Sequence, residues 1–330
     1  MPRLRTPLGW AADRWTLSPR VLRWATTFAL VTGVLIVLGG GIVRVTGSGL
    51  GCPTWPECQP GSLTATPELG IHGVIEFGNR MITGLLEVAV ACVIIAARLQ
   101  KPRVRSITRL AWSQFWLVVA NAVVGGVSVL AKLNPYVVAL HYIMAMALLT
   151  AIALTWHRVH ERPDRPREVR PAARALSWLT AAVTLVLILA GTLATGSGPH
   201  SGQAPDGSPV ARMAFDWLAV TWVHGLLAAA TLALGILLLL ILRAPGERVA
   251  RERAWFFVGA VVVQGVIGVV QAVAGLPDAL VILHVVGAAL VWVGAVRVVL
   301  DVQPGLFPSV HVGPSSEVTA SSAQARAAVR

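Results

Sequence analysis

Eight long apolar runs occupy most of this 330-residue chain. About 20 apolar residues in a helix cross the roughly 30 Å hydrocarbon core of a bilayer, and each run reaches that length. Hydrophobic residues make up 55% of the chain and charged residues only 13%, which excludes an ordinary soluble domain. We therefore predict an all-α membrane protein with eight transmembrane helices. They cover 21–44, 71–97, 110–130, 136–157, 174–195, 217–242, 253–274 and 279–302.

An internal repeat divides the predicted helices into two sets of four. Segment 121–141 aligns without a gap with segment 264–284, and eight paired residues are identical. The turn sequence Thr-Gly-Ser-Gly occurs at 46–49 and again at 195–198. Repetition of this kind predicts two related four-helix bundles. The expected divisions are an N-terminal segment (1–20), a first bundle (21–157), a basic linker (158–173), a second bundle (174–302) and a tail (303–330) whose composition predicts disorder.

Positive charge is distributed unevenly between alternate loops. Lys and Arg concentrate in the N-terminal segment and in the loops after the second, fourth and sixth predicted helices, whereas the other loops contain only Lys132 and Arg212. By the positive-inside rule, the basic loops and both termini lie in the cytoplasm. The net charge of +12 therefore reflects orientation in the cell membrane and contact with lipid, and no nucleic-acid partner is expected.

Two cysteines lie in the first predicted outer loop, 45–70. Cys52 and Cys58 are six residues apart across prolines, on the side of the membrane where thiols are oxidised, so they can close a small disulfide loop. This disulfide is either a structural staple or a redox-active pair beside a cofactor, since strained, exposed disulfides are the labile kind. The third cysteine, Cys92, lies among Ala and Val and is expected in the core.

Three histidines lie at a similar depth in three predicted helices. His141, His224 and His284 are about five to seven residues from the outer helix ends, or roughly 7–11 Å at 1.5 Å per residue. Histidines on neighbouring helices at equal depth are what a haem iron held between two axial imidazoles requires. We therefore predict that these residues bind haem iron. The histidines nearer the helix ends and in the outer loop are predicted to be solvated: His157, His160 and His200.

A cluster of polar side chains begins the second predicted helix. His72, Glu76 and Asn79 are spaced i, i+4 and i+7, so they line one helix face, and Arg80 lies beside them. A carboxyl group within a membrane span faces the bundle interior by default and indicates a functional site. Glu76 and Arg80 are also spaced for an ion pair, whose role can be limited to lowering the cost of burial.

The histidine layer has no obvious fourth member. The repeat register places the counterpart of His224 near residue 77, which is closer to Asn79 than to His72. His72 lies at the mouth of its helix, where it is a displaced iron ligand, a gate residue or a hydrogen-bonding residue at the surface. The second half has Thr221 and Gly225 where the first has Glu76 and Arg80. This asymmetry indicates that one half performs chemistry and the other holds a cofactor.

Taken together, these features resemble the haem A synthase family over about residues 25–300. The similarity rests on the first Thr-Gly-Ser-Gly turn, Cys52, Cys58, Glu76, Arg80, His141, His224 and His284. It implies that His224 and His284 bind haem b, while the first half binds the substrate haem O with His141 as one ligand. Many family members have a histidine where this chain has Asn79. The resemblance therefore leaves open whether His72 or Asn79 serves the substrate iron, or whether His141 binds it alone.

The same resemblance implies a reaction. Two successive hydroxylations of the C8 methyl group of haem O give a diol, which loses water to form the formyl group of haem A for cytochrome oxidase. Glu76 is the implied proton-handling or orienting residue, and Arg80 is expected to pair with a propionate or with Glu76. Expected partners are haem O synthase, a protohaem farnesyltransferase, and a thiol–disulfide reductant on the outer face. The competing interpretations are a cytochrome b-like membrane electron carrier and a transporter.

Overall fold

The computed structural model describes residues 6–160 and 169–303. The secondary structure of this described part is helical, apart from two isolated β-bridges in loops. Eight of its helices are long and apolar enough to cross a membrane, which confirms the prediction of eight spans in an all-α membrane protein. The predicted disordered tail and the middle of the predicted basic linker lie outside the described residues.

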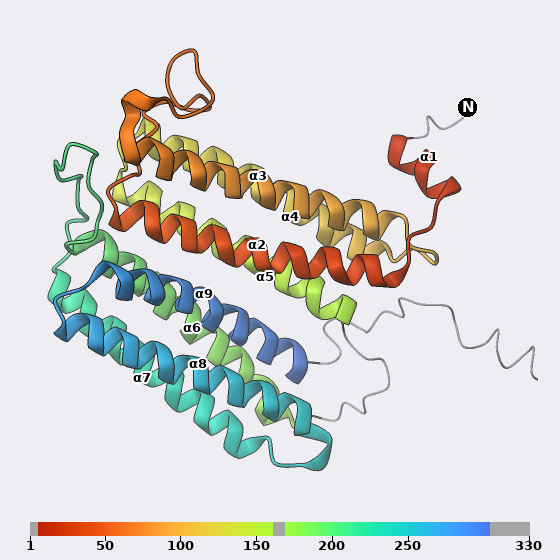
Figure 1. Cartoon of the computed structure of the whole chain (residues 1–330). Coiled ribbons are helices and arrows are strands. Elements are labelled where there is room, and N and C mark those ends of the chain that lie inside the picture. Colours follow the sequence, from red (N-terminus) through yellow and green to blue (C-terminus); the bar gives the residue numbers. More distant parts are fainter. Residues whose placement is uncertain (1–5, 161–168, 304–330) are drawn as a thin grey trace, which may run out of the picture.

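The helices run back and forth along one axis, so that all the connections gather at its two ends (Figure 1). Each predicted span corresponds to one of the helices α2 to α9. The elements are α1 (Pro7–Arg14), α2 (Pro19–Val45), η1 (Pro67–Leu69), α3 (Gly70–Arg98), α4 (Arg105–Leu130), α5 (Pro135–His160), α6 (Pro171–Ser197), α7 (Trp217–Ile241), η2 (Pro245–Glu247), α8 (Arg248–Val273) and α9 (Asp278–Val302).

Local sequence signals account for several helix starts. Pro19 and Pro171 are the first residues of α2 and α6, where the missing amide hydrogen costs nothing and the fixed φ suits a helix. Asp216 caps α7, because its carboxylate accepts a hydrogen bond from the Ala219 amide at 2.6 Å. Helices such as α8 begin several residues before the predicted span, since backbone hydrogen bonding continues through charged residues that hydropathy excludes. The sequence did not predict the short helix α1.

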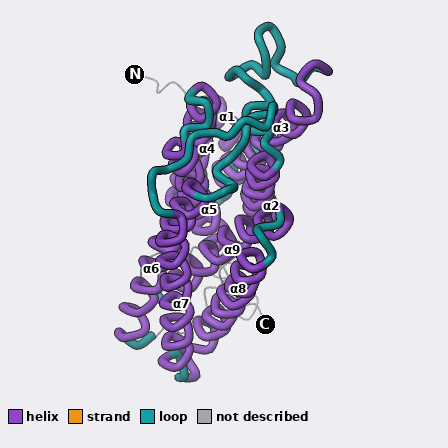
Figure 2. Tube along the Cα trace, turned by 90° about the vertical axis from the view of Figure 1, so that its left-hand side faces the viewer, coloured by secondary structure: helices purple, strands orange, loops and turns teal. Residues whose placement is uncertain are grey.

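Two main hydrophobic clusters hold the helices together. One contains side chains of α2 to α5, including Leu22 and Leu86, and the other contains side chains of α6 to α9, including Phe257. The two groups meet where α9 packs against α2 and α5, as Figures 1 and 2 show from two directions. At this junction the Trp292 indole donates a hydrogen bond to the Thr150 hydroxyl at 2.8 Å. The two-fold relation between the groups and the domain limits stay predictions.

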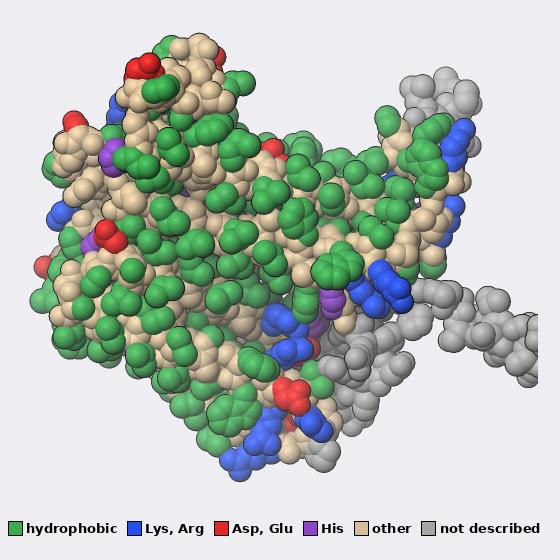
Figure 3. Space-filling model, viewed as in Figure 1, with side chains coloured by type: hydrophobic (Ala, Val, Ile, Leu, Met, Phe, Trp, Pro, Cys, Tyr) green, Lys and Arg blue, Asp and Glu red, His purple; other side chains and the backbone are tan. Residues whose placement is uncertain are grey.

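The surface and the ends of the molecule differ in composition. Apolar side chains cover the long flank, as a lipid-facing surface requires, while Lys and Arg concentrate near the end that carries α1 (Figure 3). The cysteine-containing loop lies at the opposite end (Figure 1). The basic and non-basic loops are therefore separated along the axis. Which end faces the cytoplasm stays a prediction.

Two predicted side-chain environments are wrong, those of His157 and Cys92, and two further histidines, His160 and His200, are only partly solvated. His157 is only 5% exposed, and His160 is half-buried and stacked on Trp156 with 4.3 Å between ring centroids. His200 is also half-buried, with its Nε2 3.2 Å from the Asp278 carboxylate. Conversely, Cys92 is exposed on the flank of α3. Hydropathy cannot distinguish the protein core from the lipid-facing surface, because both are apolar, and it cannot locate polar contacts between helix ends.

Candidate functional site

The second half brings two of the predicted histidines close together, with the edge of one ring toward the other. His224 lies on α7 and His284 on α9, with 6.2 Å between ring centroids and an interplanar angle of 67°. The Nδ1 of His224 is 3.1 Å from the Leu187 carbonyl oxygen, which can only accept, so Nδ1 carries the proton. The Nε2 lone pair of His224 is therefore available to a metal. A backbone carbonyl that orients an imidazole in this way is typical of metal-binding histidines.

This spacing fits a bis-histidine haem. An iron about 2 Å from each nitrogen, with the ring centre roughly 1 Å farther back, gives a centroid separation of about 6 Å. Glycines make room for both rings: a Cβ on Gly191 would lie 3.1 Å from His224 Cε1, and one on Gly268 would lie 3.1 Å from His284 Cε1. The Nδ1 of His284 is buried without a hydrogen-bond partner among the described residues. The residues present therefore fit haem b, although their role as ligands stays a prediction.

The first half repeats the glycine contacts but replaces one histidine. A Cβ on Gly125 of α4 would lie 3.0 Å from Cε1 of His141 on α5, as in the second half. The remaining helix pair is α2 and α3. Here a Cβ on Gly39 of α2 would meet the side-chain amide of Asn79 on α3. Asn79 is thus the side chain that lies against a glycine of the neighbouring helix in this pair, as a histidine does in each of the other three. Its Oδ1 is buried and has no hydrogen-bond partner in the described part of the chain.

His72 lies on the same helix face, near the N-terminal end of α3. Its Nδ1 is 3.1 Å from the Ser48 hydroxyl, which is 2.8 Å from the Thr46 hydroxyl. Both hydroxyls belong to the Thr-Gly-Ser-Gly turn that follows α2. The hydrogen-bonding interpretation of His72 is therefore observed, whereas its interpretations as an iron ligand or a gate remain predictions.

Glu76 and Arg80 form the predicted ion pair one turn deeper in α3. Arg80 Nε donates to Glu76 Oε1 at 3.2 Å, and Glu76 is only 8% exposed. The pair is therefore confirmed as an interaction. Within the described residues, Oε2 of Glu76 has no hydrogen-bond partner, so one carboxyl oxygen is free for a substrate or a proton.

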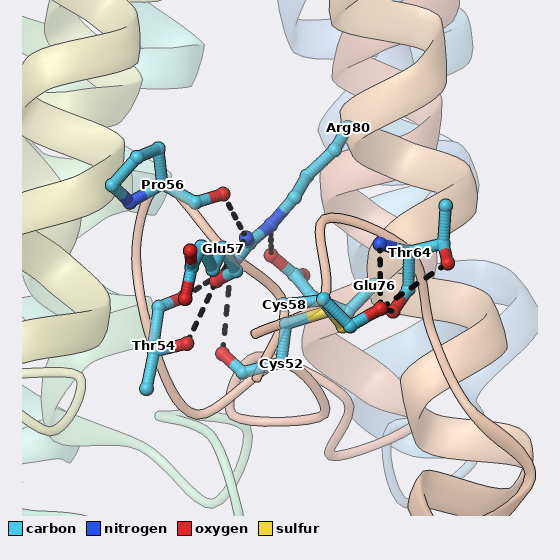
Figure 4. Close-up of a disulfide and its surroundings, with 9 residues drawn as sticks. Cys52, Thr54, Pro56, Glu57, Cys58, Thr64, Glu76 and Arg80 are labelled. Carbon is cyan, nitrogen blue, oxygen red and sulfur yellow. Dashed lines mark hydrogen bonds and ion pairs between the residues drawn. A yellow bond between two sulfur atoms is a disulfide. The ribbon is translucent and has the colours of Figure 1, made fainter. Parts of the chain in front are cut away.

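The predicted disulfide is present, and it closes a loop directly over this pair (Figure 4). Arg80 Nη1 donates to two loop carbonyls at 3.2–3.3 Å, and Nη2 donates to two more at 3.1–3.4 Å. The accepting carbonyls belong to Cys52, Thr54, Pro56 and Glu57. Sequence reasoning missed these contacts, because nothing in the loop sequence shows where its backbone carbonyls point.

Comparison of the chain with known proteins identifies its family and several relatives. The family model described as cytochrome oxidase assembly protein, COX15-CtaA, matches residues 22–296. The chain belongs to this family. Its expected membership, stated from the motifs alone, is thereby confirmed.

Relatives named Heme A synthase share moderate identity with the chain. The relative from Lysinibacillus sphaericus is 31% identical over 172 residues, which cover 50% of this chain and 54% of that relative. The relative from Staphylococcus saprophyticus is 26% identical over 239 residues, covering 63% and 76%. The alignment therefore spans about half the length of the first relative and three quarters of the second. The family is described by its role in cytochrome oxidase assembly, and both relatives are named for haem A synthesis.

Proposed function

We propose that the chain is a haem A synthase that oxidises the C8 methyl group of haem O to a formyl group. Each of two hydroxylations replaces a C–H bond by a C–O bond, takes the oxygen atom from water, and releases two protons together with two electrons that pass to an external one-electron acceptor. The resulting diol loses water and leaves the aldehyde. The observation that carries the proposal is the adjacent pair His224 and His284 in one half, together with a buried carboxyl group in the other.

The second half is proposed to hold haem b. His224 and His284 would hold its iron, and bound haem b would supply one-electron transfer. The Leu187 carbonyl keeps the proton of His224 on Nδ1 and so presents Nε2 to the iron. Gly191 and Gly268 support this assignment, because a side chain at either position would crowd the coordinating ring.

The first half is proposed to bind the substrate haem O. His141 would be the iron ligand, and Asn79 on α3, whose amide oxygen is buried without a hydrogen-bond partner among the described residues, would be the second polar side chain at this iron. We favour Asn79 over His72 here, because His72 already bonds to Ser48 at the mouth of the bundle. Glu76 would accept protons released from the methyl carbon on its free Oε2, while Oε1 stays bonded to Arg80.

Chromatographic identification of the haems in the purified protein tests this function. We expect haem b together with haem O, its hydroxylated intermediate or haem A. The variant His224→Ala should lose haem b, and His141→Ala should lose the haem O-derived species yet keep haem b. His200→Ala, which changes a histidine of the outer loop, is the matched control and should retain both pigments.

Two outcomes would contradict the proposal. A colourless protein would exclude haem binding altogether. A protein with haem b alone, unaffected by His141→Ala, would favour the cytochrome b-like electron carrier and leave the buried Glu76 without a task.

A further inference from the structure

The guanidinium of Arg80 has no donor left for a substrate. Arginine carries five N–H groups in a fixed planar fork. One of them bonds to Glu76, and the other four bond to carbonyl oxygens of the loop closed by Cys52 and Cys58. An Arg80 that binds a haem propionate would first have to break these bonds. The interpretation of Arg80 as a propionate ligand is therefore disfavoured.

The loop is built to present those carbonyls. All four accepting residues lie within the ring that the disulfide closes, from Cys52 to Cys58. The ring is held internally, because the Thr54 hydroxyl donates to the Glu57 carbonyl at 2.9 Å. Closing a short ring removes conformations in which the carbonyls would point elsewhere. The oxidised loop thus forms a preorganised cage for one cation (Figure 4).

A second contact ties the loop to α4, which packs beside α3 in the same bundle. The indole ring of Trp55 packs so closely on Gly126 of α4 that a Cβ at this position would overlap it. Gly126 neighbours Gly125, which contacts the ring of His141. The loop therefore bridges the helix that carries Glu76 and the helix that contacts the proposed iron ligand.

We propose that Arg80 is a positioning residue: it couples the disulfide-closed loop to Glu76 and so fixes the carboxyl group at the substrate site. This inference rests on the proposed function. The ion pair alone is a single hydrogen-bonded contact between two long, flexible side chains. Four further bonds to a closed ring hold the guanidinium, which in turn holds Oε1 of Glu76. Opening the ring should release the carboxyl group without removing it.

Steady-state oxidation of haem O by three variants tests the coupling. Arg80→Lys keeps the charge but cannot make five bonds, Cys52→Ser with Cys58→Ser opens the ring, and the triple variant combines them. A displacement of about 1 Å near a reacting centre costs on the order of 100-fold in rate. We therefore expect kcat to fall about 10- to 100-fold in each variant, with KM changed less than threefold. The matched control Arg212→Gln removes an exposed outer-loop cation and should leave kcat unchanged.

Non-additivity is the decisive result. If Arg80 acts through the ring, the triple variant should be no slower than the slower of its two parents. Effects that multiply would show independent roles and overturn the proposal, as would full activity of Arg80→Lys. Unchanged haem b content in every variant excludes misfolding as the cause.

An infrared measurement tests the same coupling without turnover. The carboxyl band of Glu76 is identified by its loss in Glu76→Gln, and the disulfide is then reduced with a phosphine. We expect the Glu76 band to shift on reduction in the unchanged protein and to return on reoxidation, but not to respond in Arg80→Gln. If the Glu76 band does not shift when the disulfide is reduced, the inference is overturned, even if the enzyme is active. A shifting band in a protein that does not oxidise haem O would instead refute the proposed function alone.

Discussion

Gly268→Ala should weaken haem b binding while leaving the fold intact. The new methyl group would lie 3.1 Å from Cε1 of His284, about 0.4 Å closer than ordinary van der Waals contact. Without haem, the ring can move by this amount. With haem, the iron holds the ring at its Nε2, so the strain is felt in the bound state. Overpacking of this kind costs about 1–3 kcal/mol, which corresponds to a roughly 5- to 150-fold weaker Kd for haem.

The matched control for this prediction lies one helical turn away. A Cβ at Gly265, also on α8, would meet no atom within 4 Å. Both substitutions gain about 0.5–1 kcal/mol of helix stability, so this contribution cancels when the two variants are compared. The assay is titration of each apoprotein with haem, followed by optical absorption, with thermal unfolding as the test of fold. Equal haem affinity in Gly268→Ala and Gly265→Ala would refute the assignment of His284 as an iron ligand whose ring is held in place by the bound haem.

Three further predictions concern the first half and the junction. Glu76→Gln should retain haem b but slow haem O oxidation by 100-fold or more, since it keeps the side-chain shape and removes the proton acceptor; normal yield of haem A would exclude the role. Asn79→His should supply a second imidazole opposite His141 and give bound haem O the low-spin absorption and electron paramagnetic resonance spectra of a bis-histidine iron, whereas an unchanged spectrum would show that residue 79 does not face the iron. Trp292→Phe removes the hydrogen bond to Thr150 and should destabilise the detergent-solubilised protein by about 1 kcal/mol, measured by thermal unfolding, with no loss of haem b.

The spans were predictable from sequence for a simple reason. Crossing a bilayer requires a run of apolar residues whatever the neighbouring helices are, so eight such runs predict eight helices. A polar or charged residue within such a run is expensive enough to be noticed by itself, which singled out Glu76 and the histidines. The repeat then related His141 to His284, and the spacing of the cysteines indicated their disulfide.

The contacts that complete the candidate site were decided by the tertiary structure. Asn79 lies against Gly39 and His141 lies against Gly125, and these contacts depend on which faces of α2 to α5 meet. The cage around Arg80 depends on the backbone path of a closed ring, which residue types do not specify. Hydropathy measures the free energy of transferring a side chain out of water. That free energy favours apolar residues equally in the protein core and on the lipid-facing surface. That is why Cys92 was expected inside and lies outside, and why only the packed helices could show it.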